Sequence, residues 1–392
     1  MLEKHLWRDF VGVTSSVAVL GLGVGSTLPL TALALTAHGL GPQVVGWMAA
    51  AAAAGGMAGT LASPRATIRF GRRRVMLWCV VVAAASVISL QYVDSLWGWA
   101  VLRAAFGVSL APLFVIGEAW INSLPGDAVR GRVVAIYTTS FTLCQVLGPA
   151  LTDAAARVPS HAFLICGAVF LLGIPGIALA RDPPAAAARA GYRATIGDKN
   201  AVASWLAIVR IAPAIVAGAA LFAAFDNIML SFLPLLALDH GFSQSRALAA
   251  VVVVFMGDAT LQFAAGWLAD RFGHARVHRT AGVGLCVLLP LLPLMIAVPG
   301  LWELYLFVLG GVAGSVYTLS MVSSGERFSG AALLRASGLI AFTWSLASSI
   351  GPAATGIAVQ HFGGEAMTAV LWLMALGFVL VEHLGSRRPR LI

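Results

Sequence analysis

Three ionisable residues of this sequence lie inside long apolar runs, where a charged side chain is costly. They are Asp226, Asp258 and Arg103. A charge at such a position costs about 2.5–3.5 kcal/mol on insertion scales, so it must face a cavity or a partner. Desolvation also disfavours the ionised form of a carboxyl group. We therefore interpret Asp226 and Asp258 as candidate proton-coupling groups, with a structural hydrogen bond as the alternative for each.

Polar residues near these charges complete a candidate substrate cavity. Arg103 stays charged under all physiological conditions, so it could hold an anionic substrate group or neutralise an acid such as Asp226. The alternative is a fixed ion pair or hydrogen bonds to backbone carbonyls. Gln262 follows Asp258 by four residues and shares its helix face, whereas Asn227 directly follows Asp226. The remaining candidate wall residues are Gln145, Tyr137 and Tyr317.

The composition identifies the solvent around these residues as a lipid bilayer. Apolar residues make up 59% of the 392 residues and charged residues only 10%. Soluble domains carry about 25% charged residues, and a soluble fold of this size could not hide so much apolar surface. The sequence therefore predicts an all-α membrane protein.

Twelve apolar runs are long enough to cross the bilayer, which takes about 20 residues per helix. We number them as spans one to twelve in chain order. The spans cover residues 10–36, 43–63, 75–93, 96–122, 133–153, 161–180, 210–238, 246–269, 280–298, 301–324, 335–357 and 366–384.

The distribution of positive charge predicts the orientation of these spans. The formal net charge is +9, but the basic residues form short clusters between apolar runs rather than a nucleic-acid-binding patch. With the N-terminus inside, 22 of the 25 Lys and Arg residues lie on the cytoplasmic side. Only Arg157 and Arg246 lie outside, and Arg103 lies within a span. The positive-inside rule thus predicts cytoplasmic N- and C-termini.

An internal repeat divides the chain into two halves. Gly148-Pro149-Ala150 matches Gly351-Pro352-Ala353 at an offset of 203 residues, and Arg69-Phe70-Gly71 matches Arg271-Phe272-Gly273 at an offset of 202. An even number of spans separates the repeats, so they share one orientation. We predict an N-terminal six-helix bundle over residues 1–180, a cytoplasmic linker over 181–204 and a C-terminal six-helix bundle over 205–392.

Four motifs in register carry a resemblance to the major facilitator superfamily. The segment from Gly266 to Arg276, with Asp270, Arg271 and Gly273, resembles the loop between spans eight and nine of that family. The other three are Arg103 with Gly107 in span four, Arg130-Gly131-Arg132 entering span five, and Gly148-Pro149 within span five. Glu118 and Trp120 near the inner end of span four resemble a poorly characterised bacterial branch of it.

The resemblance implies two six-helix halves related by pseudo-two-fold symmetry, rocking around a central site. It also implies that spans three, six, nine and twelve face lipid, which agrees with the absence of charge from their interiors. Asp270 is expected to dock near Arg130 and Arg132 as a cytoplasmic latch, with Glu118 in a gate ion pair. Ile68 replaces the matching acid of the first half, so the latch should be lopsided. The gate set is Asp270, Arg271, Gly266, Gly273, Arg276, Arg130, Arg132 and Glu118, and the helix-bending set is Gly148, Pro149, Gly351 and Pro352.

No sequence motif points to an enzyme, because the chain has no HExxH, Gly-x-Ser-x-Gly or Walker loop. The four cysteines lie inside apolar runs without metal-ligand spacing, so we expect no metal. We expect no cofactor, with a proton gradient as the energy source. The expected partners are a small-molecule substrate and the lipid bilayer, with no nucleic acid, for a monomer in the bacterial inner membrane.

The sequence favours a proton-coupled transporter of a small, amphiphilic organic solute, and Gly148-Pro149 favours export. One alternative is an uncoupled facilitator in which the two acids are structural, and another is a proton symporter that imports a metabolite. An alternative of another class is a membrane receptor or scaffold without transport.

Overall fold

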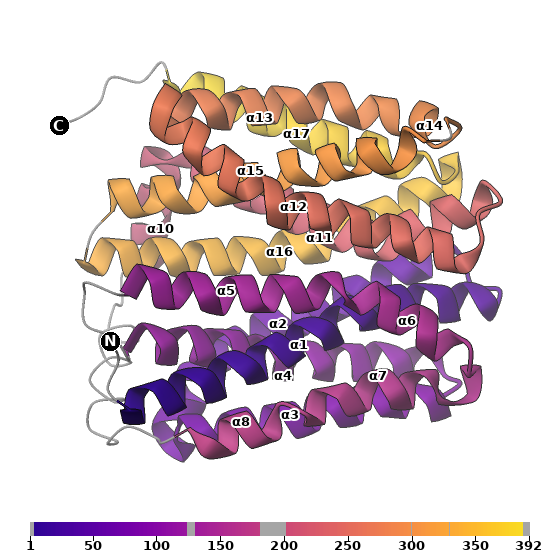
Figure 1. Cartoon of the computed structure of the whole chain (residues 1–392), viewed down its shortest axis with the longest axis horizontal. Helices are drawn as coiled ribbons and strands as arrows, with labels where there is room; N and C mark the ends of the chain where they lie inside the picture. The colour runs from indigo at the N-terminus through magenta and orange to yellow at the C-terminus, as the bar shows by residue number, and fades with distance from the viewer. Residues whose placement is uncertain (1–3, 124–129, 181–200, 299, 329, 387–392) are drawn as a thin grey trace. The chain divides into compact units, whose positions relative to one another are not determined.

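The computed structural model describes residues 4–123, 130–180, 201–298, 300–328 and 330–386. These residues form helices joined by short turns, with no β-strand in the described ranges (Figure 1). In a bilayer every backbone N–H and C=O must be satisfied within the protein, and a helix does so within one segment. The predicted all-α class is confirmed.

The helices fall into two compact units. Unit 1 comprises Met1–Ala34 and Trp47–Gly197, and unit 2 comprises Leu35–Gly46 and Asp198–Ile392. The helices up to residue 180 are α1 (Lys4–Ala37), α2 (Pro42–Phe70), α3 (Arg72–Ser89), α4 (Leu96–Ser123), α5 (Arg130–Val146), α6 (Gly148–Ala156), α7 (Ala162–Leu171) and α8 (Ile174–Leu179).

The helices from residue 201 onward all belong to unit 2. They are α10 (Ala201–Ile211), α11 (Pro213–Asp239), α12 (Gln244–Phe272), α13 (His274–Leu288), α14 (Leu292–Met295), α15 (Trp302–Arg327), α16 (Gly330–Phe362) and α17 (Ala366–Ser386). Residues 201–204 were predicted as the end of the linker, and they form the first turn of α10. Residues 181–200 lie outside the described residues.

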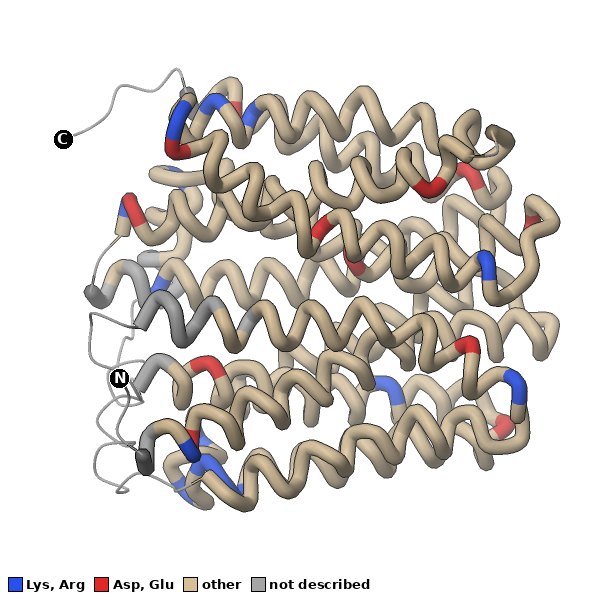
Figure 2. Tube along the Cα trace, viewed as in Figure 1, with Lys and Arg blue, Asp and Glu red and all other residues tan. Residues whose placement is uncertain are grey.

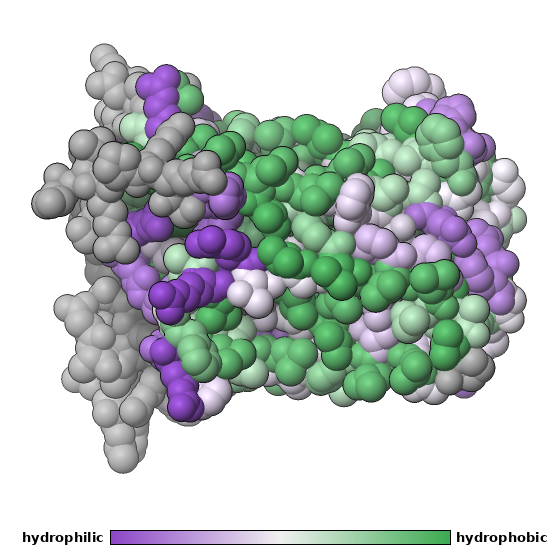
Figure 3. Space-filling view, turned by 90° about the horizontal axis from the view of Figure 1, so that it is seen from above, coloured by the Kyte–Doolittle hydropathy of each residue, from purple (hydrophilic) through white to green (hydrophobic). Residues whose placement is uncertain are grey.

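The predicted spans correspond to these helices. Ten helices in the described residues are long and apolar enough to cross a membrane. The other two predicted spans coincide with the α5–α6 pair and with α16. In each unit the charged residues gather mainly at the helix ends (Figure 2). On the face shown in Figure 3 an apolar band lies between two hydrophilic ends.

Glycines at matching helix ends reproduce the internal repeat in the backbone. Gly39 and Gly241 follow α1 and α11 with φ of 74° and 80°, and Gly71 and Gly273 join α2 to α3 and α12 to α13 with φ of 85° and 93°. Each pair is 202 residues apart. L-residues with a side chain rarely adopt this left-handed conformation, so the glycines end corresponding helices in the same way.

Candidate functional site

Asp258 lies at the middle of α12 and is buried, with 4% of its surface exposed. Gln262, one turn later, donates a hydrogen bond from Nε2 to Asp258 Oδ1 at 2.6 Å. This contact agrees with the shared helix face expected for the two residues. No basic side chain of the described residues is within ion-pair distance of Asp258, so its main polar partner is an uncharged amide.

Glycines make room for this carboxyl group between α12 and α15. A Cβ at Gly314 on α15 would overlap the Asp258 carboxyl group. Beside it, a Cβ at Gly257 would overlap the carbonyl oxygen of Phe307, and a Cβ at Gly310 would overlap that of Val254. The two backbones therefore approach closely, as small residues permit in membrane helices. Asp258 lies inside this helix interface and not on the lipid-facing surface.

The same helix contact occurs in unit 1 between α2 and α4. A Cβ at Gly55 would overlap the carbonyl oxygen of Ala104, and a Cβ at Gly107 would overlap that of Ala52. These residues precede Gly257, Phe307, Gly310 and Val254 by 202 or 203 residues, the offsets of the sequence repeat. The repeat is thus a repeat of tertiary contacts.

The acid distinguishes unit 2 from unit 1. The residues that match Asp258 and Gly314 are Gly56 and Ala111. A Cβ at Gly56 would lie 3.8 Å from the Cβ of Ala111, an ordinary contact. Unit 1 therefore has no ionisable group at the corresponding place, and Asp258 is accompanied by the glycine that its carboxyl group requires.

Asp226 lies at the middle of α11 and is also buried, with 7% exposed. Its neighbour Asn227 lies with Nδ2 3.4 Å from Asp226 Oδ2. The Asn227 amide donates to the carbonyl oxygen of Ala223 at 3.1 Å and to Ser348 Oγ on α16 at 3.0 Å. Asn227 therefore links α11 to α16, while Asp226 lies beside that link.

An aromatic cluster occupies the junction of α11, α15 and α16. The rings of Phe222 and Tyr317 stack with centroids 5.3 Å apart, and Trp344 lies 5.1 Å from Tyr317 and 5.8 Å from Phe222. Phe222 is buried, whereas Tyr317 and Trp344 are half-buried. The predicted wall residue Tyr317 thus belongs to a cluster of three aromatic side chains, of which Phe222 and Trp344 were not predicted.

Arg103 on α4 is buried in unit 1, with 1% exposed. Its Nε lies 3.5 Å from the carbonyl oxygen of Met48, and its guanidinium lies 5.3 Å from the ring centre of Phe106. The two terminal nitrogens have no hydrogen-bond partner among the described residues. Buried polar groups are normally hydrogen-bonded, so Arg103 has two strong donors that no acceptor in the described residues satisfies.

The other predicted residues of unit 1 lie on α4 and α5. Tyr137 is buried, and a Cβ at Gly117 would lie 2.7 Å from its hydroxyl oxygen. Gln145 is buried where α5 passes α1, and Glu118 is exposed on α4. The side chains of Arg130 and Arg132 lie outside the described residues, so the predicted gate pairs with them stay predictions.

The loop motif forms the connection between α12 and α13. Gly273 provides the left-handed turn, while Gly266 has open space around its Cα. The exposed Asp270 lies 3.6 Å from His274, whose Nδ1 lies 3.0 Å from Glu326 at the end of α15. Within unit 2, Asp270 therefore shares one histidine with a second acid. The exposed residues Arg271 and Arg276 flank this connection.

The two predicted bending sites differ. In unit 1 the helix is interrupted at Leu147, between α5 and α6, directly before Gly148 and Pro149. The matching Gly351 and Pro352 lie inside α16, which continues as one helix from Gly330 to Phe362. Proline removes a helix hydrogen bond at either place, but the helix is interrupted only at the first of these two sites.

A buried ionisable pair lies near the ends of the helices that correspond to spans nine and twelve. Glu382 of α17 is buried and lies 3.7 Å from the buried His278 of α13. His278 precedes the predicted start of span nine because α13 begins at His274. Glu382 lies within the predicted span twelve, so its position in the apolar run was a signal that sequence reasoning could have used.

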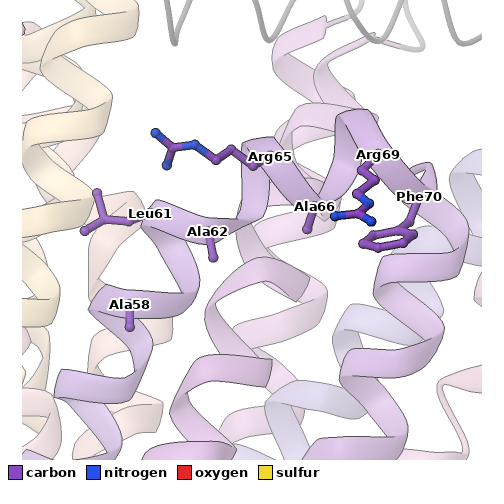
Figure 4. Close-up of a pocket in the computed structure, with 7 residues that line it drawn as sticks. All are labelled: Ala58, Leu61, Ala62, Arg65, Ala66, Arg69 and Phe70. Carbon is purple, nitrogen blue, oxygen red and sulfur yellow. The ribbon is translucent and has the colours of Figure 1, made fainter.

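An open groove on α2 lies apart from these residues. It has a volume of about 530 Å³ and is lined by Ala58, Leu61, Ala62, Arg65, Ala66, Arg69 and Phe70 (Figure 4). Arg69 lies over the ring of Phe70 at 5.2 Å. None of the predicted cavity residues lines this groove, so it is a separate feature of the α2 surface.

The sequence matches known proteins over nearly its whole length. The sequence profile of the Major Facilitator Superfamily matches residues 13–257 and 218–384. "Uncharacterized MFS-type transporter YcaD" of Escherichia fergusonii is 22% identical over 382 residues, which cover 97% of this chain and 96% of that protein. "Uncharacterized MFS-type transporter YfkF" of Bacillus subtilis is 24% identical over 359 residues, with coverage of 88% and 87%.

Solved structures of transporters share the fold. The D-xylose–proton symporter superposes with a TM-score of 0.77 at 16% identity, covering 97% of both chains. The nucleoside transporter NupG superposes with a TM-score of 0.74 at 12% identity, covering 98% of both chains. At these identities the likeness establishes the fold alone, and it confirms the fold predicted from the sequence motifs.

Proposed function

Because this chain belongs to the major facilitator superfamily of transmembrane transporters, we propose that it couples proton movement to the transport of a small, amphiphilic organic solute. Membership of a transporter family removes the alternative of a receptor or scaffold without transport. The observation that carries the proposal is the buried Asp258, which is held by an amide and has no basic side chain of the described residues within ion-pair distance.

Proton coupling follows from the surroundings of Asp258. A carboxylate buried without a positive partner has a large desolvation cost, and protonation removes that cost. A carboxyl group that is protonated when buried and ionised when hydrated can carry one proton per transport cycle. The close contact with Gly314 supports this role, because a small displacement of α15 would change the space around the carboxyl group. Asp226, beside the Asn227 link, is the second coupling candidate.

The proposed substrate class follows from the cluster of Phe222, Tyr317 and Trp344. Aromatic faces bind apolar rings and also cations, and in small-molecule sites such surfaces are combined with a few polar groups. The half-buried Tyr317 and Trp344 leave part of their rings accessible. A small organic solute with an apolar part suits these surfaces better than a polyanion does.

We further propose the orientation and direction that the sequence predicts, with both termini in the cytoplasm and transport as export. Proton symport is retained as the second candidate because the same buried carboxyl group serves a symporter equally well. The sign of the proton flux that accompanies substrate movement distinguishes the two. An uncoupled facilitator would show no such flux.

The test starts with a ligand-induced thermal-shift screen of small organic compounds on the purified protein. A stabilising compound is then used in proteoliposomes, with wild type, Asp258→Asn and Asp226→Asn. We expect Asp258→Asn to retain exchange of the compound between the two sides, because binding and helix movement remain. We expect it to lose accumulation driven by an imposed pH gradient. Asp239→Asn, an exposed acid at the end of α11, is the matched control and should retain both activities.

Two outcomes would contradict the proposal. Wild-type exchange without any proton flux would identify an uncoupled facilitator. Gradient-driven accumulation that persists in Asp258→Asn and in Asp226→Asn would show that neither acid carries the proton.

A further inference from the structure

A buried histidine–glutamate pair joins three helices of unit 2 away from Asp258. His278 on α13 and Glu382 on α17 are 3% and 7% exposed, and Nδ1 of the histidine lies 3.7 Å from Oε2 of the glutamate. The other ring nitrogen, Nε2, lies 3.1 Å from both the carbonyl oxygen of Val316 and Oγ of Ser320 on α15. The imidazole is thus held from two sides by different helices.

The contacts determine which ring nitrogen carries the permanent proton. The carbonyl oxygen of Val316 can only accept, and it already accepts from Ser320 Oγ at 2.8 Å. Nε2 therefore serves as the donor on this side, and neutral imidazole then has its lone pair on Nδ1. That lone pair is on the side of the Glu382 carboxyl group. The two atoms, 3.7 Å apart, are too distant for a hydrogen bond, but a charge on either group still acts on the other.

No other charged group of the described residues neutralises the pair. The phenyl ring of Phe378 lies with its centre 4.8 Å from the imidazole centre of His278. The backbone of α11 passes close to the imidazole at Gly218. None of the charged or titratable side chains on the packed helices is within ion-pair distance of His278 or Glu382. These side chains include His274, Arg276 and Arg279 on α13, Glu326 and Arg327 on α15, His383 on α17 and Asp226 on α11.

We propose that His278 and Glu382 form a proton-binding site that takes up one proton as a unit. Without the proton the pair is a neutral imidazole beside a carboxylate, with a net charge of −1 in an apolar interior. With the proton it is an ion pair or a neutral imidazole beside a carboxylic acid, and both have zero net charge. Burial penalises an uncompensated charge, so the closed packing of α13, α15 and α17 retains the proton and hydration of the pair releases it.

The site is distinct from the coupling role proposed for Asp258. It binds a proton whether or not a substrate is present, so its test needs no substrate and does not depend on the proposed function. Ser320 and Gly314 lie on the same helix, α15, which offers a physical route by which protonation at one site can affect the other.

The chain contains a matched exposed pair that serves as the control. Nε2 of His240, after α11, lies 4.0 Å from Oε1 of Glu365, before α17, and their side chains are 32% and 60% exposed. The residue types and the separation are almost those of the buried pair, and the main difference is burial. An exposed glutamate is ionised above about pH 5.5, so Glu365→Gln should leave proton binding above that pH unchanged.

The experiment is a proton titration of the full chain in detergent, from about pH 5.5 to about pH 8.5. We expect Glu382→Gln to bind about one proton fewer than wild type over this range, because a buried imidazole without an acidic partner stays neutral. The double variant with His278→Gln should lose the same single proton rather than two. Glu365→Gln should titrate as wild type.

A proton count in Glu382→Gln equal to that of wild type would overturn the proposal and identify the pair as a static contact between helices. A loss of two protons in the double variant would overturn the shared site. If Glu382→Gln does not fold, the comparison of the double variant with Glu365→Gln decides between the same outcomes.

Discussion

The carboxyl group of Asp258 occupies the space that a side chain at Gly314 would fill. The acid on α12 and the glycine on α15 therefore act as one unit. In the first repeat the matching residues are Gly56 and Ala111, so the small residue and the larger one are on opposite helices. This exchange explains how one repeat holds a buried acid and the other does not.

Gly314→Ala is expected to displace the Asp258 carboxyl group or to push α15 away. Overpacking of this kind lowers the free energy of unfolding by about 1–3 kcal/mol, and gradient-driven transport should fall with it. Gly325→Ala is the control, because it lies on the same helix with open space around it. It should be neutral or stabilising by up to about 1 kcal/mol. Equal stability of the two variants, measured by thermal unfolding in detergent, would contradict the overlap.

Asn227→Ala removes the hydrogen bonds that the amide donates to Ala223 and to Ser348. We expect the free energy of unfolding to fall by about 1–2 kcal/mol, the usual cost of breaking buried hydrogen bonds. A double-mutant cycle with Ser348→Ala measures the link between α11 and α16 directly. An interaction energy of about 0.5 kcal/mol or more is expected for groups in direct contact, and strict additivity would refute the link.

Arg103→Met separates a structural role from a functional one. If the guanidinium stabilised the fold, its removal would be destabilising. Because its terminal nitrogens have no partner among the described residues, removal should instead raise the free energy of unfolding by about 1 kcal/mol, since an unpaired buried charge is costly. Transport of a compound found by the thermal-shift screen should fall at least about tenfold. Arg157→Met, at an exposed ion pair, should change neither quantity measurably. A large loss of stability in Arg103→Met would assign the residue to structure.

Asp270→Asn tests the cytoplasmic latch predicted from the loop motif. We expect the variant to favour the inward-open state, because the amide cannot form the charge pairs of the carboxylate. Single cysteines placed along the inner cavity, in a background without Cys79, Cys144, Cys166 and Cys286, should then react faster with a membrane-impermeant thiol reagent. Glu326→Gln serves as the comparison, because it also loses a partner of His274 but lies outside the motif. Unchanged reactivity in Asp270→Asn would refute the latch.

The sequence by itself determined which segments are helices and how they repeat. A bilayer forces apolar runs of this length to be helical. The twelve predicted spans could therefore be located from the positions of the apolar runs in the sequence. The repeat offsets of 202 and 203 residues, derived from two short motifs, recur in the contacts of Gly55, Gly107, Gly257 and Gly310. The spacing of Gln262 from Asp258 was likewise enough to predict that they share a face, since helix geometry fixes it.

Only the tertiary structure decided what each buried group touches. The glycine that makes room for Asp258 lies on α15, and the partners of His278 lie on α15 and α17. Helix periodicity on one segment carries no information about the face of another. The sequence therefore gave no sign that Gly314 makes room for an acid, or that His278 and Glu382, 104 residues apart in the chain, form one site. Those pairings arise from the packing of helices, and packing depends on side chains that are distant in the sequence.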